Sequence, residues 1–149
     1  MRCGAPLRER TLSGVTRLAC AAAGCGWVFY DNPTPVVAAI VQRGDEVILV
    51  RSPGWPATWY GLVTGFLEKG EGPEEGVLRE VEEELGLAGE LVSFVGLYPF
   101  EQRNQLLIAY HVRVAGAVTL GDELEASKAI PIAKLRPWPF GTGHAVRDW

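Results

Sequence analysis

No part of this sequence is apolar over the roughly 18 residues that a membrane-spanning helix requires. The N-terminal region also lacks the apolar core of a secretory signal, because its alanine-rich segment at residues 19–25 is short and interrupted by glycine. Internal repeats and low-complexity segments are absent too. We therefore expect a soluble, cytoplasmic protein that does not contact a membrane.

Basic residues are not in excess: 14 Lys and Arg stand against 18 Asp and Glu, which gives a formal net charge of −4. This balance argues against a passive nucleic-acid binder, which needs a basic surface. An acidic protein that handles anionic phosphates needs a cation between them. The length of 149 residues, 48% of them hydrophobic, predicts one domain with a substantial core and room for a small appendage.

Cysteine is scarce, and all three cysteines lie in residues 1–33. An odd number in a cytosolic setting gives little support to a disulfide. A closed tetrahedral zinc site needs four ligands, whereas this segment offers only Cys3, Cys20 and Cys25. We therefore do not expect a structural zinc. The simpler expectation is a metal-free, turn-rich segment at residues 1–33 and a main domain at residues 34–149. The segment would pack its aromatic residues Trp27, Phe29 and Tyr30 onto the main domain.

One stretch, residues 65–87, combines features that ordinary core or surface sequence seldom combines. Pro73 suits the first position of a helix, because proline lacks the N–H that would have no partner there. Gly86 suits the C-terminal cap. Apolar residues between them recur at the spacing of one helix face: Val77, Val81 and Leu85. The stretch therefore predicts a helix with one face packed on a core.

Three carboxylates fall within one turn on an exposed stripe beside that face: Glu80, Glu83 and Glu84. Like charges at this spacing cost a few tenths of a kcal/mol per pair in an isolated helix, but a hard divalent cation would reverse the sign. Gly65 has no side chain, so its carbonyl could approach the same ion, and Arg79 could pair with Glu71. An acidic solvated helix face is the alternative; the loop, the proline start and the spacing together favour a metal site.

These residues follow the pattern G-x5-E-x7-R-E-U-x-E-E-x-G-U, in which U is a bulky apolar residue. This pattern is the signature of the Nudix hydrolases, and the sequence resembles that family. The fixed positions are all filled: Gly65, Glu71, Arg79, Glu80, Val81, Glu83, Glu84, Gly86 and Leu87. The flanking segments NPTPVVAAIV and PWPFGTGHAVRDW, with the cysteine-bearing start, resemble the NADH pyrophosphatase branch of the family.

The resemblance implies an α/β fold, a Nudix-type α/β/α sandwich with a mixed β-sheet between helices. The order of predicted elements agrees with it. Strands are predicted at residues 36–42 and 46–51 as a hairpin and then at 62–64, 91–98, 105–114 and 130–135. Alternation in residues 105–114 places His111 on the wetter face as a surface residue. Thr142 could cap a final helix.

The resemblance also implies a site for Mg²⁺, or Mn²⁺ in its place, built from the clustered acids and one backbone carbonyl: Glu80, Glu83, Glu84 and Gly65. The same acids and Arg79 would be catalytic, and we assign the general base to Glu80. In related enzymes a glutamate from a second acidic cluster often completes the metal site. We assign that role to Glu123, with Asp122 as the alternative. In the NADH pyrophosphatase branch the N-terminal segment is a zinc ribbon with two C-x2-C pairs, a pattern that this chain does not follow.

Candidates for substrate contact flank the predicted helix on both sides. Tyr60 ends a loop rich in Trp and Pro, and Phe66 follows Gly65; the aromatic residues either cover the core or stack on a nucleotide base. The polar loop after residue 98 offers Glu101, Arg103 and Asn104, as substrate contacts or as an ordinary hairpin loop.

The predicted activity is metal-dependent hydrolysis of the pyrophosphate bond in a nucleoside diphosphate linked to another moiety, such as NADH or ADP-ribose, with release of a mononucleotide. One alternative is a nucleoside triphosphate pyrophosphohydrolase. A second is a non-catalytic nucleotide-sensing module, although no acid of the motif is lost. A third is an RNA-binding adaptor that uses the N-terminal arginines Arg2, Arg8, Arg10 and Arg17. Cleavage of NAD-capped RNA ends would combine RNA binding with the enzyme activity. A homodimer is left open.

Overall fold

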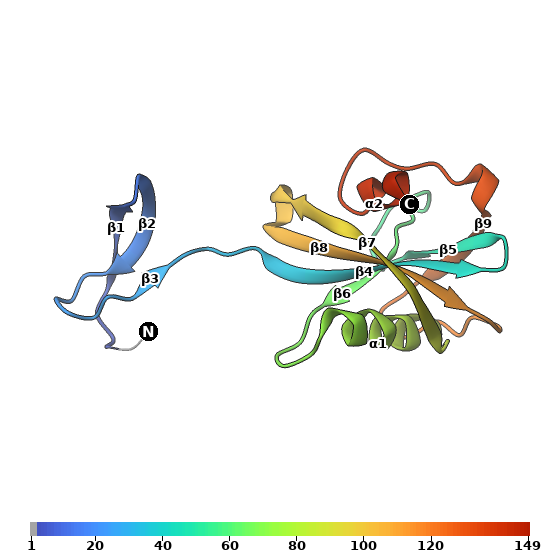
Figure 1. Ribbon diagram of the computed structural model, residues 1–149, viewed down its shortest axis with the longest axis horizontal. Coiled ribbons are helices and arrows are strands. Elements are labelled where there is room, and N and C mark those ends of the chain that lie inside the picture. The colour runs from blue at the N-terminus through green and yellow to red at the C-terminus, as the bar shows by residue number, and fades with distance from the viewer. Residues whose placement is uncertain (1–2) are drawn as a thin grey trace. The chain divides into compact units, whose positions relative to one another are not determined.

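The structure is a computed structural model that describes residues 3–149 (Figure 1). Its internal contacts divide the chain into a small N-terminal unit, which ends at Asn32, and a main unit, Pro33–Trp149. Arg2, one of the four arginines of the predicted basic patch, lies outside the described residues. None of the helices in the described part of the chain has the length and apolar character to cross a bilayer.

The small unit is a three-stranded antiparallel sheet in the order β1-β2-β3, not the turn-rich segment that we expected. Its strands are β1 (Leu7–Leu12), β2 (Val15–Cys20) and β3 (Val28–Phe29). Ser13 and Gly14 join the first two strands with φ angles of 50° and 81°. Positive φ at both positions is what a two-residue hairpin turn requires, so this turn makes a sheet possible in so short a segment.

The main unit contains a six-stranded mixed sheet in the order β7-β8-β4-β5-β9, with β6 also paired to β4. The strands are β4 (Thr34–Arg43), β5 (Glu46–Arg51), β6 (Val63–Phe66), β7 (Gly89–Phe100), β8 (Gln105–Val114) and β9 (Ala126–Pro131). Strands β4 and β8 are parallel, and the other pairs are antiparallel. The predicted mixed α/β fold is therefore confirmed.

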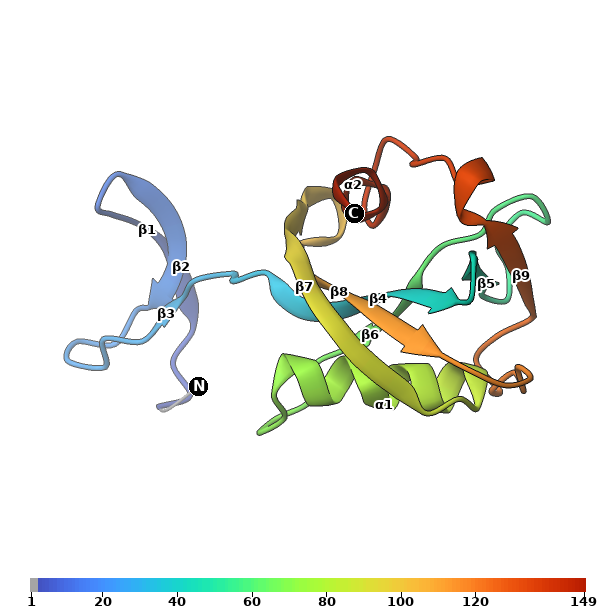
Figure 2. The same ribbon diagram turned by 45° about the vertical axis from the view of Figure 1, so that its right-hand side comes forward.

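Strand β4 is buried on both faces, which explains its unbroken apolar run. Helix α1 (Pro73–Leu85) covers one face of the sheet and α2 (Gly143–Asp148) the other, as Figures 1 and 2 both show. Val37, Ala39 and Val41 pack in the α1-side core with the buried apolar residues of that helix. Alternate residues of β4 pack on the other side with Ala145 and Val146 of α2.

At the C-terminal end one predicted detail is wrong and another is confirmed in position only. The strand expected at residues 130–135 lies earlier, at β9, and a 3₁₀ helix, η2 (Ile132–Lys134), follows it. The strand stops at Pro131 because proline has no N–H to continue the ladder. Thr142 is the N-cap residue of α2, as predicted, but it has a helical conformation with φ −68° and ψ −12°, and its side chain makes no capping hydrogen bond.

His111 is buried, not on the surface as predicted. Its Nε2 lies 2.7 Å from Gln42 Oε1, and its ring packs edge-on against Trp149 with 5.1 Å between the centroids. The alternation in β8 predicts one solvent-exposed face and one buried face, but both faces of this strand are covered. Burial, and secondarily the charge of Arg113, lower the pKa of His111.

Candidate metal and active site

Helix α1 carries the site and is held at both ends by backbone interactions. Gly72 is the N-cap, and its N–H donates to Glu75 Oε2 at 3.1 Å. Gly86 is the C-cap in the left-handed conformation with φ 63°, and its N–H donates to the Glu82 carbonyl at 2.8 Å. The helix bounds inferred from Pro73 and Gly86 are thus confirmed.

Arg79 organises the acidic residues around it. Its Nε and Nη2 donate to the two carboxylate oxygens of Glu71 at 2.8 and 3.0 Å. Its Nη1 donates to Glu80 Oε1 at 2.7 Å and to Glu83 Oε2 at 2.9 Å, and Nη2 also donates to the Phe66 carbonyl at 3.2 Å. A guanidinium has five N–H donors, and these five contacts use that capacity. Arg79 therefore positions the loop and the acids from within the protein.

The opposite charges also shift the ionisation of these groups. Hydrogen bonds from Arg79 lower the pKa of Glu71, and Glu71 in turn raises that of Arg79. Burial raises the pKa of Glu80, although Arg79 opposes the shift. The predicted pairing of Arg79 with Glu71 is confirmed, and it ties the loop before the helix to the helix itself.

Gly65 lies against the Glu80 carboxylate. A Cβ at position 65 would overlap the Glu80 carboxylate. Only glycine leaves room for this carboxylate beside β6. The Gly65 backbone and the Glu80 carboxylate are consequently neighbours, as a shared metal ion would require.

Glu84 has a buried carboxylate oxygen that no hydrogen bond from the described residues satisfies. It is buried, contrary to the exposed stripe that we predicted, and its Oε2 has no hydrogen-bond partner. Burial, and then the charges of Glu80, Glu123 and Glu83, raise its pKa to about 8. A buried carboxylate oxygen without a partner costs free energy unless it is protonated or bound to a cation.

The loop before β9 brings Glu123 toward the same place. The N–H of Thr119 donates to the Leu85 carbonyl at 2.9 Å, and that of Gly121 to the Glu84 carbonyl at 3.0 Å, so the loop closes the C-terminal end of α1. Glu123 is near enough to raise the pKa values of Glu80 and Glu84 by its charge. Three of the acids that the sequence assigned to the metal therefore lie on one helix, Glu80, Glu83 and Glu84, and the charge of Glu123 acts on two of them.

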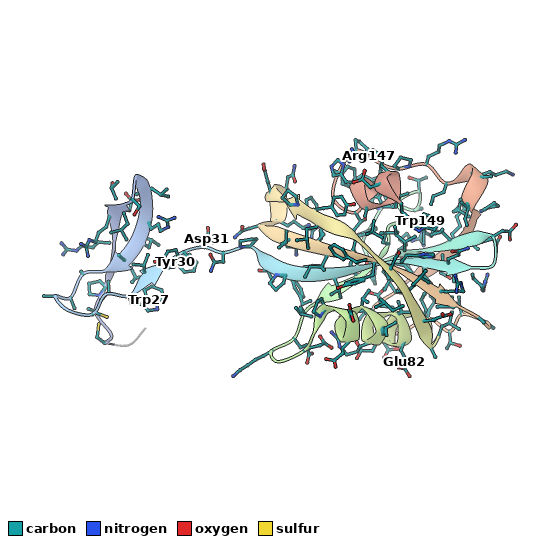
Figure 3. The ribbon with its side chains drawn as sticks, in the orientation of Figure 1. Trp27, Tyr30, Asp31, Glu82, Arg147 and Trp149 are labelled. Atoms are coloured by element: carbon teal, nitrogen blue, oxygen red, sulfur yellow. The ribbon has the colours of Figure 1, made fainter. Side chains whose placement is uncertain are left out.

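The donor set of this cluster fits Mg²⁺ or Mn²⁺. It offers carboxylate oxygens near a backbone position, one of them buried and unpartnered, and hard divalent cations prefer such oxygen ligands. The side chain of Glu83 is 59% exposed, so the cluster opens to solvent and to a substrate on that side. Glu82, by contrast, lies on the outer side of α1, pointing away from the sheet (Figure 3).

The predicted substrate contacts are dispersed. Phe66 is exposed one residue after Gly65, whereas Tyr60 packs against the α2-side core with the Arg51 guanidinium over its ring. Tyr60 therefore covers the core. Glu101 and Arg103 are exposed in the 3₁₀ helix η1 (Glu101–Arg103), and Asn104 ends it with φ 48°. The Asn104 carbonyl accepts the N–H of Thr34 at 2.8 Å, so this residue also shapes the loop.

A shallow hollow of about 120 Å³ lies beside η1, and sequence reasoning missed most of its lining. Glu101 was a candidate, but the other residues were not: Pro99, Phe100, Gln102, Pro139, Phe140, Gly141 and His144. Trp59 packs against Phe140 with 6.3 Å between the ring centroids, and both rings are largely exposed. The segment PWPFGTGH contained a signal for this hollow, because its prolines and glycines favour an irregular loop before α2, and Phe140 in that loop is exposed.

The three cysteines of the small unit come together, although their spacing in the sequence is irregular. Their Sγ atoms all lie within 4.8 Å of one another. The sulfurs are therefore close neighbours, although they are still only three of the four ligands that a closed tetrahedral site needs.

Residues 32–147 match the family model described as the NUDIX domain. The chain belongs to the NUDIX family. This Nudix chain is 32% identical over 123 residues to a protein of Pseudomonas putida KT2440 named NAD-capped RNA hydrolase NudC; the match covers 81% of this chain and 45% of that protein. A protein of the same name from Stutzerimonas stutzeri is 31% identical over 139 residues, covering 92% and 49% respectively. The chain thus spans about half the length of these curated relatives.

Solved structures share the Nudix fold. A NUDIX hydrolase from Nitrosomonas europaea superimposes with a TM-score of 0.76 at 22% identity, over 90% of this chain and 77% of that one. An ADP-ribose pyrophosphatase from Streptococcus suis gives a TM-score of 0.65 at 20% identity, over 78% and 89%. These structural similarities show the fold alone. The resemblance to the Nudix family that the sequence indicates is confirmed by the match to the family model.

Proposed function

We propose that this chain is a divalent-metal-dependent Nudix pyrophosphohydrolase. The observation that carries the proposal is the buried, unpartnered Oε2 of Glu84 within a group of four carboxylates. Without a cation, three nearby acidic groups would oppose its ionisation. With Mg²⁺ or Mn²⁺, the same arrangement becomes a set of oxygen ligands from Glu80, Glu83, Glu84, Glu123 and the Gly65 carbonyl.

When bound, the divalent ion would neutralise charge on phosphoryl oxygens and acidify a water molecule. Hydrolysis forms a bond from the water oxygen to one phosphorus and breaks the bridging P–O bond, whose electron pair leaves with the other phosphate. One water proton must be accepted as the bond forms. We assign this to Glu80, whose Oε1 is fixed by Arg79 while Oε2 makes no hydrogen bond within the described chain.

We further propose that the substrate is a nucleoside diphosphate linked to another moiety, such as NADH or ADP-ribose, and that a mononucleotide is released. The two curated relatives described above carry the name NAD-capped RNA hydrolase, and an NAD cap contains such a linkage. The exposed rings of Trp59 and Phe140 beside the hollow would suit a planar base. Glu101 in the hollow wall is a candidate for contact with the sugar or the second phosphate. The other candidates for substrate contact do not line the hollow: Phe66, Arg103 and Asn104.

The decisive experiment measures products from NADH, ADP-ribose, an NAD-capped RNA and a nucleoside triphosphate side by side with Mg²⁺. We expect AMP from the first two and a 5′-monophosphate RNA end from the third, all faster than release of pyrophosphate from the triphosphate. Glu84→Gln serves as the inactive comparison and Glu82→Gln as the matched control on the outer side of the same helix. Faster turnover of triphosphates with pyrophosphate as the main product would contradict the proposed substrate class.

A further inference from the structure

The sheet of the small unit has two chemically different faces. In its antiparallel register Arg10 lies directly opposite Arg17, and Arg8, two residues from Arg10 along β1, lies opposite Ala19. Residues that lie opposite each other, or two apart on one strand, share a face of a sheet. The three arginines therefore share one face, which we call the basic face. Among the described residues, none of the three takes part in an ion pair.

The acidic residue of these strands, Glu9, lies on the opposite face. Glu9 pairs with Leu18, and Leu18 in turn pairs with Phe29, so these three residues share the face that the arginines leave. Phe29 also stacks on Trp27, with 6.3 Å between the ring centroids and 17° between the ring planes. The sheet thus separates a positively charged face from a mainly apolar one, and Glu9 does not compensate the charge of the basic face.

An exposed aromatic ring borders the basic face. Tyr30 directly follows β3 (Figure 3), and 61% of this residue is exposed. The Arg17 guanidinium lies over the Tyr30 ring, with its Cζ 5.3 Å from the centroid, and its Nη1 donates to the Leu12 carbonyl at 3.2 Å. Arg17 is therefore held in place by two contacts. Because the guanidinium lies over only one side of an exposed ring, the other side can accept a second planar group.

The stability of the sheet does not explain the basic face. Like charges directly opposite each other on neighbouring strands are destabilising, and Arg10 and Arg17 are such a pair. A strand of nucleic acid would reverse the sign, because its phosphates neutralise arginines and its unpaired bases stack on aromatic rings and guanidinium planes. A double helix offers only the charge, since its bases are already paired and stacked. Charge and an open ring on one face therefore favour a single strand.

We propose that the basic face binds single-stranded RNA, with phosphates against Arg8 and Arg10 and one base stacked on Tyr30 beside Arg17. The choice of RNA as the partner rests on the proposed function, whereas the charge and the stacking do not. Stacking uses the ring face that every base has and reads no base edge, so binding should tolerate most sequences. The small unit would thus contribute affinity for the RNA chain, apart from the chemistry that the carboxylate site of the main unit performs on the cap.

The test measures the fluorescence anisotropy of a labelled RNA of about ten nucleotides, titrated with the full chain in Mg²⁺. The RNA carries a 5′-hydroxyl and no cap, so it has no pyrophosphate bond and turnover plays no part. Tyr30→Leu should weaken binding by about 5- to 100-fold, the range that loss of one stacked base implies, and Tyr30→Phe should stay within about twofold. Phe29→Leu is the matched control, because it removes an exposed aromatic ring from the opposite face.

Two further measurements do not depend on Tyr30 alone. Arg10→Gln changes an exposed residue and should reduce the dependence of log Kd on log salt concentration by about 0.7. A duplex of the same sequence should bind more weakly than the single strand and should not respond to Tyr30→Leu. Hydrogen exchange of the β1 and β2 amides checks that each variant keeps its sheet.

Unchanged affinity of Tyr30→Leu, an equal loss in Phe29→Leu, or a duplex bound as tightly as the single strand would overturn the proposal. NADH turnover is followed separately and tests the proposed function alone. RNA binding without turnover, or turnover without RNA binding, therefore shows which of the two proposals fails.

Discussion

The acidic residues of the candidate site differ in whether an opposite charge compensates them. Arg79 satisfies Glu71, Glu80 and Glu83, whereas Glu84 is left buried without a partner. Glu84 therefore destabilises the metal-free protein, whereas in the proposed site it would be needed to bind the metal.

We predict that Glu84→Gln stabilises the metal-free protein and abolishes most of its turnover. The pKa of Glu84 is raised to about 8 in the folded state, from an ordinary value of 4.5. The folded chain thus holds a proton that the unfolded chain releases, so this group lowers stability progressively as the pH rises from about 4.5 to 8. The melting temperature of the variant should exceed that of the native chain by several degrees at pH 9 and by little at pH 5.

In the presence of Mg²⁺ the same change should lower kcat/KM by on the order of 10²- to 10³-fold, because one ligand of the charge-stabilising site is lost. Glu82→Gln removes one charge from the outer side of the same helix and should leave turnover unchanged. Near-normal activity of Glu84→Gln would show that the metal site is elsewhere.

Gly65→Ala is expected to disrupt the site without unfolding the chain. The added Cβ would occupy the position of the Glu80 carboxylate, the movable end of a side chain, so that the carboxylate must leave. Turnover and Mg²⁺ affinity should fall by at least about 100-fold. Gly72→Ala is the control, since a Cβ there meets its nearest atom at an ordinary 3.6 Å. Circular dichroism should be native for both, and equal losses in the two variants would contradict the role given to Gly65.

At the scale of elements, the sequence was most informative where local rules act alone. Helix α1 and the β4–β5 hairpin follow from Pro73, Gly86 and apolar periodicity. The position of His111 could not be predicted, because its burial depends on α2 and Trp149, far along the chain. The assembly of the cysteines was hidden for a similar reason, since a two-residue turn and a sheet register bring them together. Glu80, Glu83 and Glu84 could be named from the motif and Glu123 from the second acidic cluster, but the burial of Glu84 needed the fold.

The packing of α2 should be sensitive to acid through His111. Its pKa is lowered by burial, so the unfolded chain binds a proton near pH 6.5 that the folded chain refuses. Stability should therefore fall as the pH drops below about 6.5. Denaturant unfolding of His111→Gln between pH 5.5 and 7.5 should show a flatter pH dependence than the native chain. An unchanged slope in His111→Gln would show that His111 does not titrate on unfolding.

For the whole molecule, charge is divided unequally between the two units. Residues 1–32 contain four arginines against two acidic residues, which gives +2, and residues 33–149 contain ten basic and sixteen acidic residues, which gives −6. On the small unit Arg10 and Arg17 face each other across β1 and β2, with Arg8 two residues along β1. Like charges opposite each other destabilise a sheet, whereas a basic surface attracts an anionic partner. The arginines therefore indicate binding of an anion more than stabilisation of the sheet.

We therefore predict that these arginines matter for a capped RNA and not for a free dinucleotide. Replacing Arg8, Arg10 and Arg17 with alanine should weaken binding of an NAD-capped RNA and reduce its dependence on log salt concentration by roughly 2, at about 0.7 per phosphate contact on a single strand. NADH turnover should stay within about twofold, because the carboxylate site lies in the other unit and small changes away from a site are usually tolerated. Binding isotherms at several salt concentrations, with Arg136→Ala in the main unit as control, measure the difference. If both substrates lost activity equally, the arginines would be supporting the fold; if neither changed, the RNA would be recognised by its cap alone.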